Sequence, residues 1–330
     1  MKIKEPMESI YANSSLDELD FMLLTELELN ARATFQEIAA KMGTSTTTVR
    51  RRLERLLNEG FVSFATIADP VALGYLTMVE FGITVAGGKA EAVANKLMLH
   101  KNVRHLLATT GRYDLIAAVI IRNIQDFLEF MREDLGNIPE IAGIDTIVHL
   151  QQIKTNWPFL GRSADESIRK SKFRDLDSLD IALIGELEKD PRRAISAIAK
   201  DLDANRGVLG RKLQMLLEDG IIKIISIPDL VTLGYNIWTV ISVQVEPGSI
   251  ESVANQLKQY PNVTHVVLVS GSFQIRASTI FRNRDHMRDF VNHDLGSIRG
   301  VMHHETALNL KVYKRNLMLV AQKPYGREDR

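Results

Sequence analysis

The sequence predicts an α+β chain that consists of two tandem copies of one unit. Short motifs recur at a fixed offset of 160 residues (233 − 73), since Leu73-Gly74-Tyr75 returns as Leu233-Gly234-Tyr235 and Asp134-Leu135-Gly136 returns as Asp294-Leu295-Gly296. Within each copy, the spacing of apolar residues changes from a helical period to the alternation of a strand. A single long offset without gaps indicates a duplicated module rather than a solenoid of short repeats.

Length and composition narrow the class of protein further. A chain of 330 residues and 37.1 kDa is too long for one ordinary core. The 41 basic and 41 acidic residues balance, so any nucleic-acid contact must come from a local basic patch. The absence of cysteine excludes disulfides and thiolate metal sites, and no cofactor, metal site or catalytic group is indicated. We find no membrane-spanning run and no signal peptide after Met1, so a cytoplasmic protein is expected.

Residues 16–70 have the pattern of a helix-turn-helix domain followed by a short strand at 61–67. Two capping boxes are expected to begin the first two helices, namely Ser15 with Glu18 and Thr34 with Glu37. Gly43 is expected to end the second helix, and Ser45 or Thr46 to cap the third. The inward-facing residues of that third helix are expected to be Val49, Leu53, Leu56 and Leu57. Three short helices with a tight turn between the last two predict a helix-turn-helix.

Residues 71–156 change to a mixed pattern of strands and helices. Apolar residues alternate along the first strand, at Val79, Phe81, Ile83 and Val85. The remaining elements are expected at 90–99 (helix), 103–109 and 115–121 (strands), 124–135 (helix) and 144–152 (strand). This β-α-β-β-α-β order is the ferredoxin-like arrangement. The second copy repeats both domains at 176–230 and 231–316, after a polar linker at 157–175.

The third helix of the first copy carries a local positive charge. Residues 41–60 contain five basic and two acidic residues, whereas the equivalent residues 201–220 contain three basic and four acidic residues. Arginine can bind guanine edges or phosphate, and threonine can meet phosphate or a thymine methyl group. DNA contacts are therefore expected from Ser45, Thr46, Thr47, Thr48, Arg50, Arg51, Arg52 and Arg55, and weaker contacts from Arg206, Arg211 and Lys212.

Two alternatives accompany this interpretation. A basic helix can instead be a solvated surface that packs against an acidic neighbour. In the second copy, Arg50 is replaced by Gly210 and Arg55 by Met215, while the apolar positions are kept. The second helix-turn-helix is therefore interpreted as a weak or non-specific DNA reader, or as a packing partner only.

The motifs in their order resemble those of the Lrp/AsnC family of feast/famine transcriptional regulators, in a tandem duplicated form. The motifs that carry the resemblance are the opening Leu-Asp-x-Leu-Asp, then Arg52-Leu53-x-Arg55-Leu56, Glu59-Gly60-Phe61-Val62, Leu73-Gly74-Tyr75 and Gly111-Arg112-Tyr113-Asp114-Leu115. The resemblance implies a winged-type helix-turn-helix followed by a ferredoxin-like effector domain of the RAM type. It implies a DNA-binding regulator whose effector domains pair face to face, associate further, and bind small molecules, often amino acids, in clefts between them.

The resemblance also points to effector-binding residues. Gly111, Tyr113 and Asp114 match the family's pocket-forming turn, and the second copy offers Gly271, Phe273 and Gln274 as a weaker equivalent. A carboxylate at Asp114 could receive an α-ammonium group, whereas glutamine lacks that charge. The alternative is that Gly111 allows a tight turn and Asp114 only caps it.

An enzyme is the other class that the resemblance raises. Siroheme decarboxylases share this domain pair, and some are fused duplicates, with a His-Asn-Tyr segment on the strand that here carries His105 and His265. Here the residues that follow each histidine are apolar. The regulator is therefore the preferred interpretation, and a decarboxylase-like enzyme is the alternative. The first effector domain is expected to pair with the second within the chain, with further homo-oligomerisation.

Overall fold

Side-chain caps determine where the helices of the first helix-turn-helix domain begin. In the computed structural model, which describes residues 16–155 and 175–320, these helices are α2 (Glu18–Leu29), α3 (Phe35–Met42) and α4 (Thr46–Asn58). Asp17 and Asp20 form the capping box of α2, because each side chain accepts a hydrogen bond from the other's backbone N–H. The predicted box of Ser15 with Glu18 is wrong, and Ser15 itself lies outside the described residues.

The tight turn between α3 and α4 confirms the prediction at Gly43. Gly43 has φ +62°, in the left-handed region that a side chain disfavours. The predicted box of Thr34 with Glu37 caps α3. Ser45 caps α4, and its Oγ accepts a hydrogen bond from the backbone of Thr48 at 3.1 Å. Of the four residues predicted to face inward from α4, only Leu57 is wrong; it is 40 % exposed because the neighbouring Leu56 takes the inner face.

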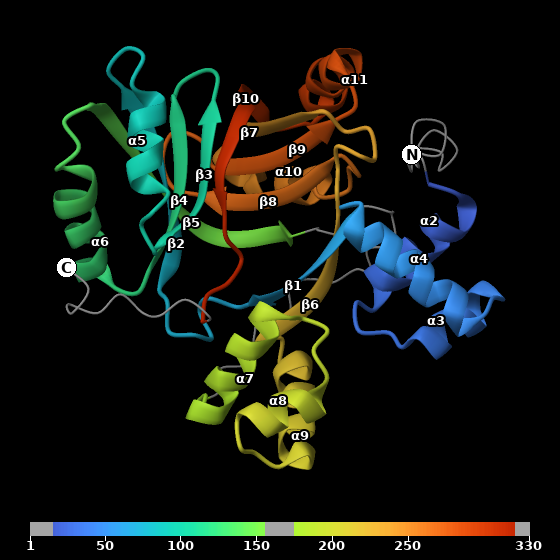
Figure 1. Ribbon diagram of the computed structural model, residues 1–330. Coiled ribbons are helices and arrows are strands. Elements are labelled where there is room, and N and C mark those ends of the chain that lie inside the picture. The colour runs from blue at the N-terminus through green and yellow to red at the C-terminus, as the bar shows by residue number, and fades with distance from the viewer. Residues whose placement is uncertain (1–15, 156–174, 321–330) are drawn as a thin grey trace. The chain divides into compact units, whose positions relative to one another are not determined.

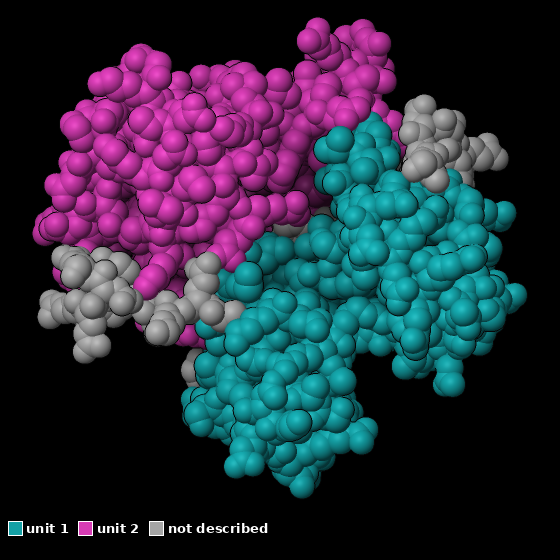
Figure 2. All heavy atoms as spheres, in the orientation of Figure 1, with its two compact units in different colours: residues 1–72, 156–235, 317–323 teal, residues 73–155, 236–316, 324–330 magenta. Residues whose placement is uncertain are grey.

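The chain divides into two compact units, coloured separately in Figure 2. Unit 1 contains both helix-turn-helix regions and consists of residues 1–72, 156–235 and 317–323. Unit 2 contains both ferredoxin-like regions and consists of residues 73–155, 236–316 and 324–330. Most of the predicted linker at 157–175 lies outside the described residues. None of the described helices is long and apolar enough to cross a membrane.

In unit 1, a strand from each copy joins the two helix-turn-helix regions. The second copy supplies α7 (Ser178–Lys189), α8 (Ile195–Asp201) and α9 (Arg206–Glu218), and the strands are β1 (Val62–Ala68) and β6 (Ile222–Pro228). The two strands pair antiparallel over seven residues, from Val62 opposite Pro228 to Ala68 opposite Ile222, and lie side by side in Figure 1. The ladder satisfies backbone groups of both strands and therefore fixes one helix-turn-helix against the other.

A reciprocal pair of arginines strengthens this junction. Arg32 donates from Nη1 to the carbonyl oxygen of Pro191 at 2.6 Å. Arg192 occupies the equivalent position in the second copy and donates from Nη2 to the carbonyl oxygen of Ala33 at 3.1 Å. The guanidinium of Arg192 also lies 5.0 Å from the ring centroid of Phe64. Burial lowers the pKa of both arginines, so each charge is partly removed from water at the junction.

In unit 2, each copy has the predicted β-α-β-β-α-β order. The first copy consists of β2 (Thr77–Val85), α5 (Ala90–Leu97), β3 (Val103–Thr109), β4 (Leu115–Ile121), α6 (Ile124–Glu129), a π-helical turn (Phe130–Leu135) and β5 (Ile141–Thr155). The second copy consists of β7 (Ile237–Val245), a 3₁₀ turn (Pro247–Ser249), α10 (Ile250–Leu257), β8 (Val263–Val269), β9 (Ile275–Phe281), α11 (Arg284–Asp289), a π-helical turn (Phe290–Asp294), a 3₁₀ turn (Leu295–Ser297) and β10 (Val301–Arg315).

Each ferredoxin-like sheet presents one face to its own helices. In the first copy the strand order is β3-β4-β2-β5, and α5 and α6 cover one face of this sheet (Figure 1). Fully buried residues such as Phe81 and Ile83 pack there with Phe130 of the π-helical turn, and the Phe81 and Phe130 ring centroids are 5.3 Å apart. Because side chains alternate along a strand, the residues next to these, such as Glu80 before Phe81, point to the opposite face.

Long terminal strands join the two sheets at both edges. β5 pairs with β2 and then with β8, while β10 pairs with β7 and then with β3. The final strand of the first copy is therefore longer than the predicted 144–152, because its last residues continue onto the second sheet. Reciprocal lysines lie at these edges, since Lys154 donates to the carbonyl oxygen of Tyr260 at 3.0 Å and Lys314 to that of His100 at 2.7 Å.

Candidate functional site

The start of α4 presents a polar and basic surface to solvent. Ser45, Thr46, Thr47, Arg50 and Arg51 are exposed, whereas Thr48 is half-buried and its hydroxyl lies 2.9 Å from Ser45 Oγ. The guanidinium of Arg50 lies 5.3 Å from the ring centroid of Phe35 on α3, which restricts its direction without removing its charge from solvent. These side chains are able to reach DNA, because the first turns of a recognition helix commonly contact base edges in the major groove.

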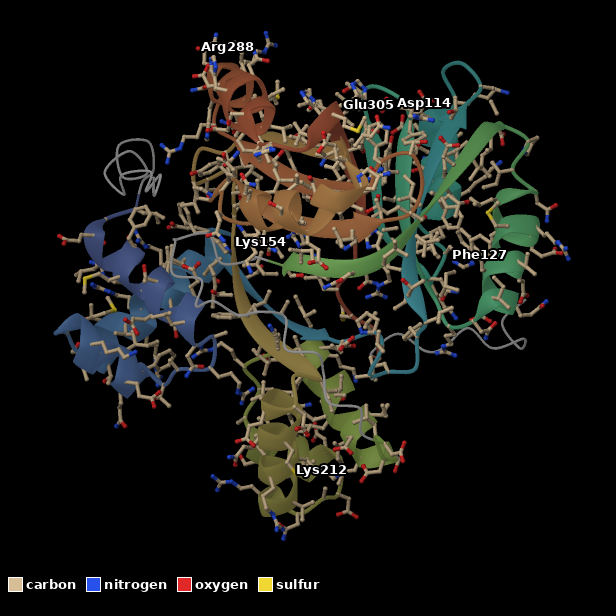
Figure 3. All side chains as sticks on the ribbon, turned by 180° about the vertical axis from the view of Figure 1, so that it is seen from behind. Asp114, Phe127, Lys154, Lys212, Arg288 and Glu305 are labelled. Carbon is tan, nitrogen blue, oxygen red and sulfur yellow. The ribbon has the colours of Figure 1, made fainter. Side chains whose placement is uncertain are left out.

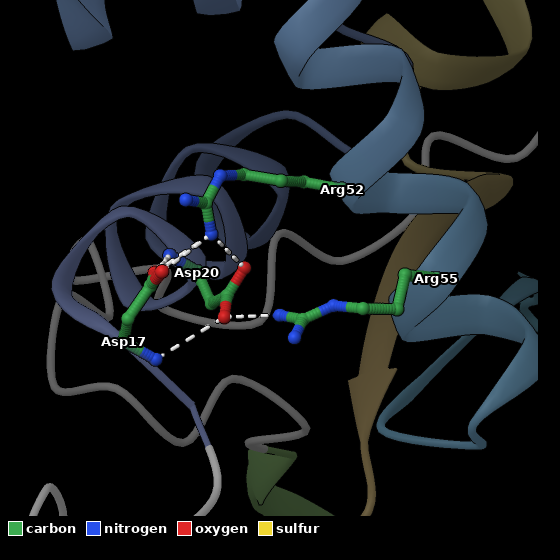
Figure 4. A network of polar contacts seen from close by, with 4 residues as sticks. All are labelled: Asp17, Asp20, Arg52 and Arg55. Carbon is green, nitrogen blue, oxygen red and sulfur yellow. Dashed lines mark hydrogen bonds and ion pairs between the residues drawn. The ribbon is translucent and has the colours of Figure 1, made fainter.

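Two of the predicted DNA-binding arginines are engaged within the domain (Figure 4). Arg52 Nη1 lies 2.7 Å from Asp17 Oδ2 and 2.8 Å from Asp20 Oδ1, and Arg55 Nη2 forms an ion pair with Asp20 Oδ2. The Asp20 side chain is only 1 % exposed, so these arginines balance a carboxylate that would otherwise be costly to bury. Hydrogen bonding to Asp17 raises the pKa of Arg52. The same two carboxylates therefore cap α2 and hold α4 in place.

The reading surface of α9 in the second copy is different. Arg206 and Arg211 are exposed, but Gly210 stands at the position of Arg50. Lys212 Nζ lies 2.6 Å from Asp177 Oδ2 and 3.0 Å from Asp180 Oδ1, so it repeats the part that Arg52 plays in the first copy. Lys212 is labelled in Figure 3. The α9 surface thus retains two exposed cations, whereas α4 offers arginines together with hydroxyl groups.

In the second copy, α9 lacks the counterpart of the ion pair that Arg55 forms between the equivalent helices of the first copy, and a cavity lies at this place. Met215 occupies the position of Arg55 and is 46 % exposed. A cavity of about 390 Å³ lies beside it, lined by Asp177, Asp180, Arg211 and Lys212 among others. In the first copy, the side chain of Arg55 extends from this position to the buried carboxylate of the equivalent helix.

The predicted effector-binding turn of the first copy is held by polar contacts. Gly111 has φ +90°, and Tyr113 Oη donates to Asp145 Oδ2 on β5 at 2.8 Å. The Tyr113 ring lies over Gly82, where a Cβ atom would come within 2.5 Å of the ring. Asp114 is exposed, and its Oδ2 accepts a hydrogen bond from the backbone of Val85 at 2.7 Å. One carboxylate oxygen of Asp114 thus caps the end of β2, as expected if Asp114 only stabilises the turn.

The two copies meet at this turn. Arg112 Nε lies 3.3 Å from Asp145 Oδ2, and its Nη1 lies 3.9 Å from Glu305 Oε1 on β10. Asp114 and Glu305, both labelled in Figure 3, lie at the same end of unit 2. The sequence motifs did not predict Arg112 or Asp145 as site residues. A signal was present in the sequence, since the offset of 160 places Asp145 on Glu305 and so keeps an acid in both copies.

The corresponding turn of the second copy has different chemistry. Gly271 has φ +104°, and Gln274 Oε1 accepts a hydrogen bond from the backbone of Val245 at 3.1 Å. Gln274 therefore makes the contact that Asp114 makes in the first copy, without a charge. Phe273 replaces Tyr113, and its ring centroid lies 6.1 Å from that of His303. Among the described residues, the charged effector-binding candidates gather at the first turn.

The histidines raised by the enzyme alternative are both half-buried. Burial is the main cause that lowers the pKa of His105 to about 4 and that of His265 to about 3. Both rings are therefore neutral at physiological pH. His265 Nδ1 lies 3.1 Å from Thr264 Oγ1.

Comparison with known proteins supports both kinds of domain. The model of the Lrp/AsnC ligand binding domain matches residues 79–158 and 239–319, and a winged helix-turn-helix DNA-binding model matches residues 16–63. The transcriptional regulator FL11 of Pyrococcus abyssi is 30 % identical over 141 residues, which cover 42 % of this chain and 93 % of FL11. The transcriptional regulator Ptr1 of Methanocaldococcus jannaschii is 31 % identical over 140 residues, which cover 42 % of this chain and 95 % of Ptr1.

A solved structure resembles the chain over most of its length. The siroheme decarboxylase NirDL has a TM-score of 0.66 and 16 % sequence identity, with 90 % of this chain and 93 % of NirDL covered. At this identity the likeness concerns the fold alone. The regulators FL11 and Ptr1, by contrast, match one module of this chain over nearly their whole length. Together with the two domain models, they show that the chain belongs to the Lrp/AsnC family of DNA-binding transcriptional regulators.

Proposed function

We propose that the chain binds operator DNA mainly through α4 of the first copy, and that α9 of the second copy adds a weaker contact. The observation that carries this proposal is the set of exposed side chains at the start of α4, namely Ser45, Thr46, Thr47, Arg50 and Arg51. Thr48 lies at the edge of this set. Arg52 and Arg55 act by holding α4 against α2, and Arg206, Arg211 and Lys212 form the weaker surface.

Selection from random DNA tests this proposal directly. The full-length chain is incubated with random duplexes, bound fragments are sequenced over several rounds, and the enriched fragment is used to measure Kd across a salt series. We expect a recurring motif and an affinity that falls steeply with salt, by about one unit of log–log slope for each phosphate contact. Random sequences after several rounds, or an affinity independent of salt, would contradict the proposal.

We propose further that the effector domains bind a small molecule, such as an amino acid, at the turn of the first copy. Gly111, Tyr113 and Asp114 supply this site together with Arg112, and the turn of the second copy, with Gly271, Phe273 and Gln274, supplies a weaker one. The support is the gathering of ionisable groups at an exposed turn, because a carboxylate and a guanidinium complement the ammonium and carboxylate groups of an amino acid.

A pair of substitutions separates binding from turn stability. Asp114→Asn keeps an oxygen for the Val85 N–H but removes the negative charge. We expect it to reduce the response of DNA binding to an amino-acid panel at least tenfold, with little change in melting temperature. Gln274→Ala in the second copy is the control for turn stability, because it removes the equivalent hydrogen bond from an uncharged turn. An unchanged amino-acid response in Asp114→Asn would exclude this site.

The assembly that accompanies this proposal is a chain with two unequal reading heads. Its domains are residues 16–70 and 176–230 for DNA and 71–156 and 231–316 for pairing and effector binding. Because one head is weak, a chain alone contacts half of a palindrome well, and we expect chains to associate further on DNA. Analytical ultracentrifugation at micromolar concentration, with and without the selected fragment, measures this association. A single 37.1 kDa chain per site would contradict it.

The alternative function is a siroheme-decarboxylase-like activity. The observation that favours it is the likeness to NirDL over 90 % of the chain. The lowered pKa values of His105, about 4, and of His265, about 3, weigh against it, because a catalytic acid–base histidine works best with a pKa near the operating pH. Titration of the chain with an iron porphyrin, followed by its absorbance, tests this alternative. We expect no saturable spectral change.

A further inference from the structure

An ion pair that is largely buried crosses between the two effector domains. Glu80 on β2 and Arg276 on β9 lie on the inner faces of their sheets, with Glu80 Oε2 3.0 Å from Arg276 Nε. His149 on β5 holds the other oxygen, with its Nε2 2.8 Å from Glu80 Oε1. The three side chains are 16 %, 6 % and 17 % exposed, respectively.

The sequence repeat shows that this contact is not duplicated. The residue equivalent to Glu80 in the second copy is Val240, and the residue equivalent to Arg276 in the first copy is Ile116. Both Val240 and Ile116 are buried. The two positions that the repeat makes equivalent to the ion pair therefore carry buried apolar residues. The contacts of Lys154 and Lys314 between the two domains, by contrast, occur in both directions.

Glu80 is ionised in this setting. Burial alone would raise its pKa, but the charge of Arg276 and the hydrogen bond from His149 lower the pKa to about 2. A buried ion pair adds little to the free energy of unfolding, because the cost of removing both charges from water offsets their attraction. Removal of one partner is strongly destabilising, because the remaining charge is buried without compensation. The effect of Glu80 and Arg276 on stability thus depends on which two effector domains pair.

Pairing between identical domains would break the contact. Two first-copy domains would place each Glu80 opposite an Ile116, and two second-copy domains would place each Arg276 opposite a Val240. Each arrangement buries two like charges without the opposite charge that each one faces in this chain. Pairing of a first-copy domain with a second-copy domain buries none.

We propose that Glu80, supported by His149, and Arg276 make the pairing face selective, so that the first effector domain accepts the second effector domain of its own chain and rejects a copy of itself. The partner that fits this face is a ferredoxin-like sheet with a guanidinium at the position of Arg276. An effector domain with an apolar residue at that position is excluded, whether it comes from a second copy of this chain or from a single-module relative.

Partner exchange between two variants tests the selectivity. Glu80→Val and Arg276→Ile each insert the residue that the other copy carries at the equivalent position. Each variant alone holds one unpaired buried charge. When the two variants exchange domains, Glu80 of one chain meets Arg276 of the other, and Val meets Ile at the second interface. The exchanged pair therefore contains no unpaired charge.

Introduced cysteines report the exchange, because the natural sequence has none. Gln151 and Leu268 are direct partners across β5 and β8. Gln151→Cys is placed in the Arg276→Ile chain and Leu268→Cys in the Glu80→Val chain, the two are unfolded and refolded together, and an added oxidant closes any disulfide. We expect a cross-linked species of twice the mass of one chain, at least several-fold more abundant than with the same cysteines in chains that keep Glu80 and Arg276.

The controls are the same cysteines in the unaltered background and the double variant Glu80→Val/Arg276→Ile. Equal cross-linking in the variant mixture and in the unaltered background would overturn the proposal. If a single variant fails to fold, the double variant Glu80→Val/Arg276→Ile supplies the test, because it buries apolar residues at both places. We expect the double variant to melt above either single variant and to cross-link between chains no less than the unaltered background. A double variant less stable than both single variants would also overturn the proposal.

Discussion

Arg32 of the first copy and Arg192 of the second make the same contact in opposite directions, and Lys154 and Lys314 do the same in unit 2. The recognition helices do not match in this way. Arg50 and Arg55 on α4 correspond to Gly210 and Met215 on α9. These junction contacts are therefore kept in duplicate, whereas the basic surface of the third helix is retained in one copy.

This difference separates two demands on a duplicated chain. The contacts of Arg32 and Arg192 are kept in both copies, where each copy contributes half of the same interface. A reading head, by contrast, can change in one copy as long as the helix still packs, and α9 keeps Leu209, Leu213 and Leu216 buried. The comparison between α4 and α9 thus predicts which substitutions affect DNA binding and which affect only the fold.

The largest effect is expected from the exposed arginines of α4. Arg50→Ala together with Arg51→Ala should weaken binding to the selected DNA by about 100-fold or more, because each bidentate base contact is worth about 1–3 kcal/mol. Arg211→Ala removes the residue equivalent to Arg51 from α9 and should weaken binding less than about fivefold. Fluorescence anisotropy at fixed salt measures both. Equal losses from the two variants would show that both heads read DNA.

The next effect concerns the carboxylate that holds α4. Asp20→Ala removes the partner of Arg52 and Arg55 and half of the α2 capping box, and should cost about 2–3 kcal/mol of local stability. Asp180→Ala in the second copy should have a similar cost in α7 and α9. Amide hydrogen exchange in the helices measures the cost.

The two aspartate variants should differ in DNA binding. Asp20→Ala releases α4, the helix proposed to read DNA, and is expected to weaken binding at least tenfold. Asp180→Ala, the matched control, is expected to change it less than twofold. If Asp20→Ala bound DNA normally despite faster exchange in α4, then the tie between α2 and α4 would not position the reading surface.

The fold could be predicted from the sequence because the repeat and the apolar periods are local signals. The roles of Arg52 and Arg55 could not, because their direction depends on Asp17 and Asp20, which are more than 30 residues earlier in the chain. Periodicity places an arginine on an outer arc but does not identify a buried carboxylate next to it. The Glu80–Arg276 pair was missed for the same reason, since it joins residues 196 positions apart (276 − 80).

The histidines of unit 2 predict a loss of stability in mild acid. All eight histidines lie between residues 100 and 304, so unit 1 has none. The folded-state pKa of His105, about 4, and that of His265, about 3, lie below the unfolded value near 6.5. Their contribution is therefore complete above pH 6.5 and is lost as the pH falls below it, because the unfolded chain binds protons that the folded chain does not.

Glu80 does not contribute to the change in stability between pH 7 and pH 5. Its folded pKa of about 2 lies below the ordinary 4.5, so its contribution is intact above pH 4.5 and is lost only below it. Between pH 7 and pH 5, unit 2 should lose about 2 kcal/mol for each of the two histidines, while unit 1 changes little. Calorimetry should show this separation. His105→Gln with His265→Gln should flatten the loss, and His293→Gln, at an exposed position, should not.

The smallest effect should come from rebuilding the second reading head. Gly210→Arg places a guanidinium at the position equivalent to Arg50, with nothing within 4 Å of the added Cβ, and it also replaces a poor helix former. One new phosphate contact should raise affinity for DNA of any sequence about threefold to tenfold and increase the salt slope by about one unit. Gly210→Ala is the matched control, because it improves the helix without adding charge. A gain in affinity shared by both variants would mean that helix stability, rather than charge, limits the second head.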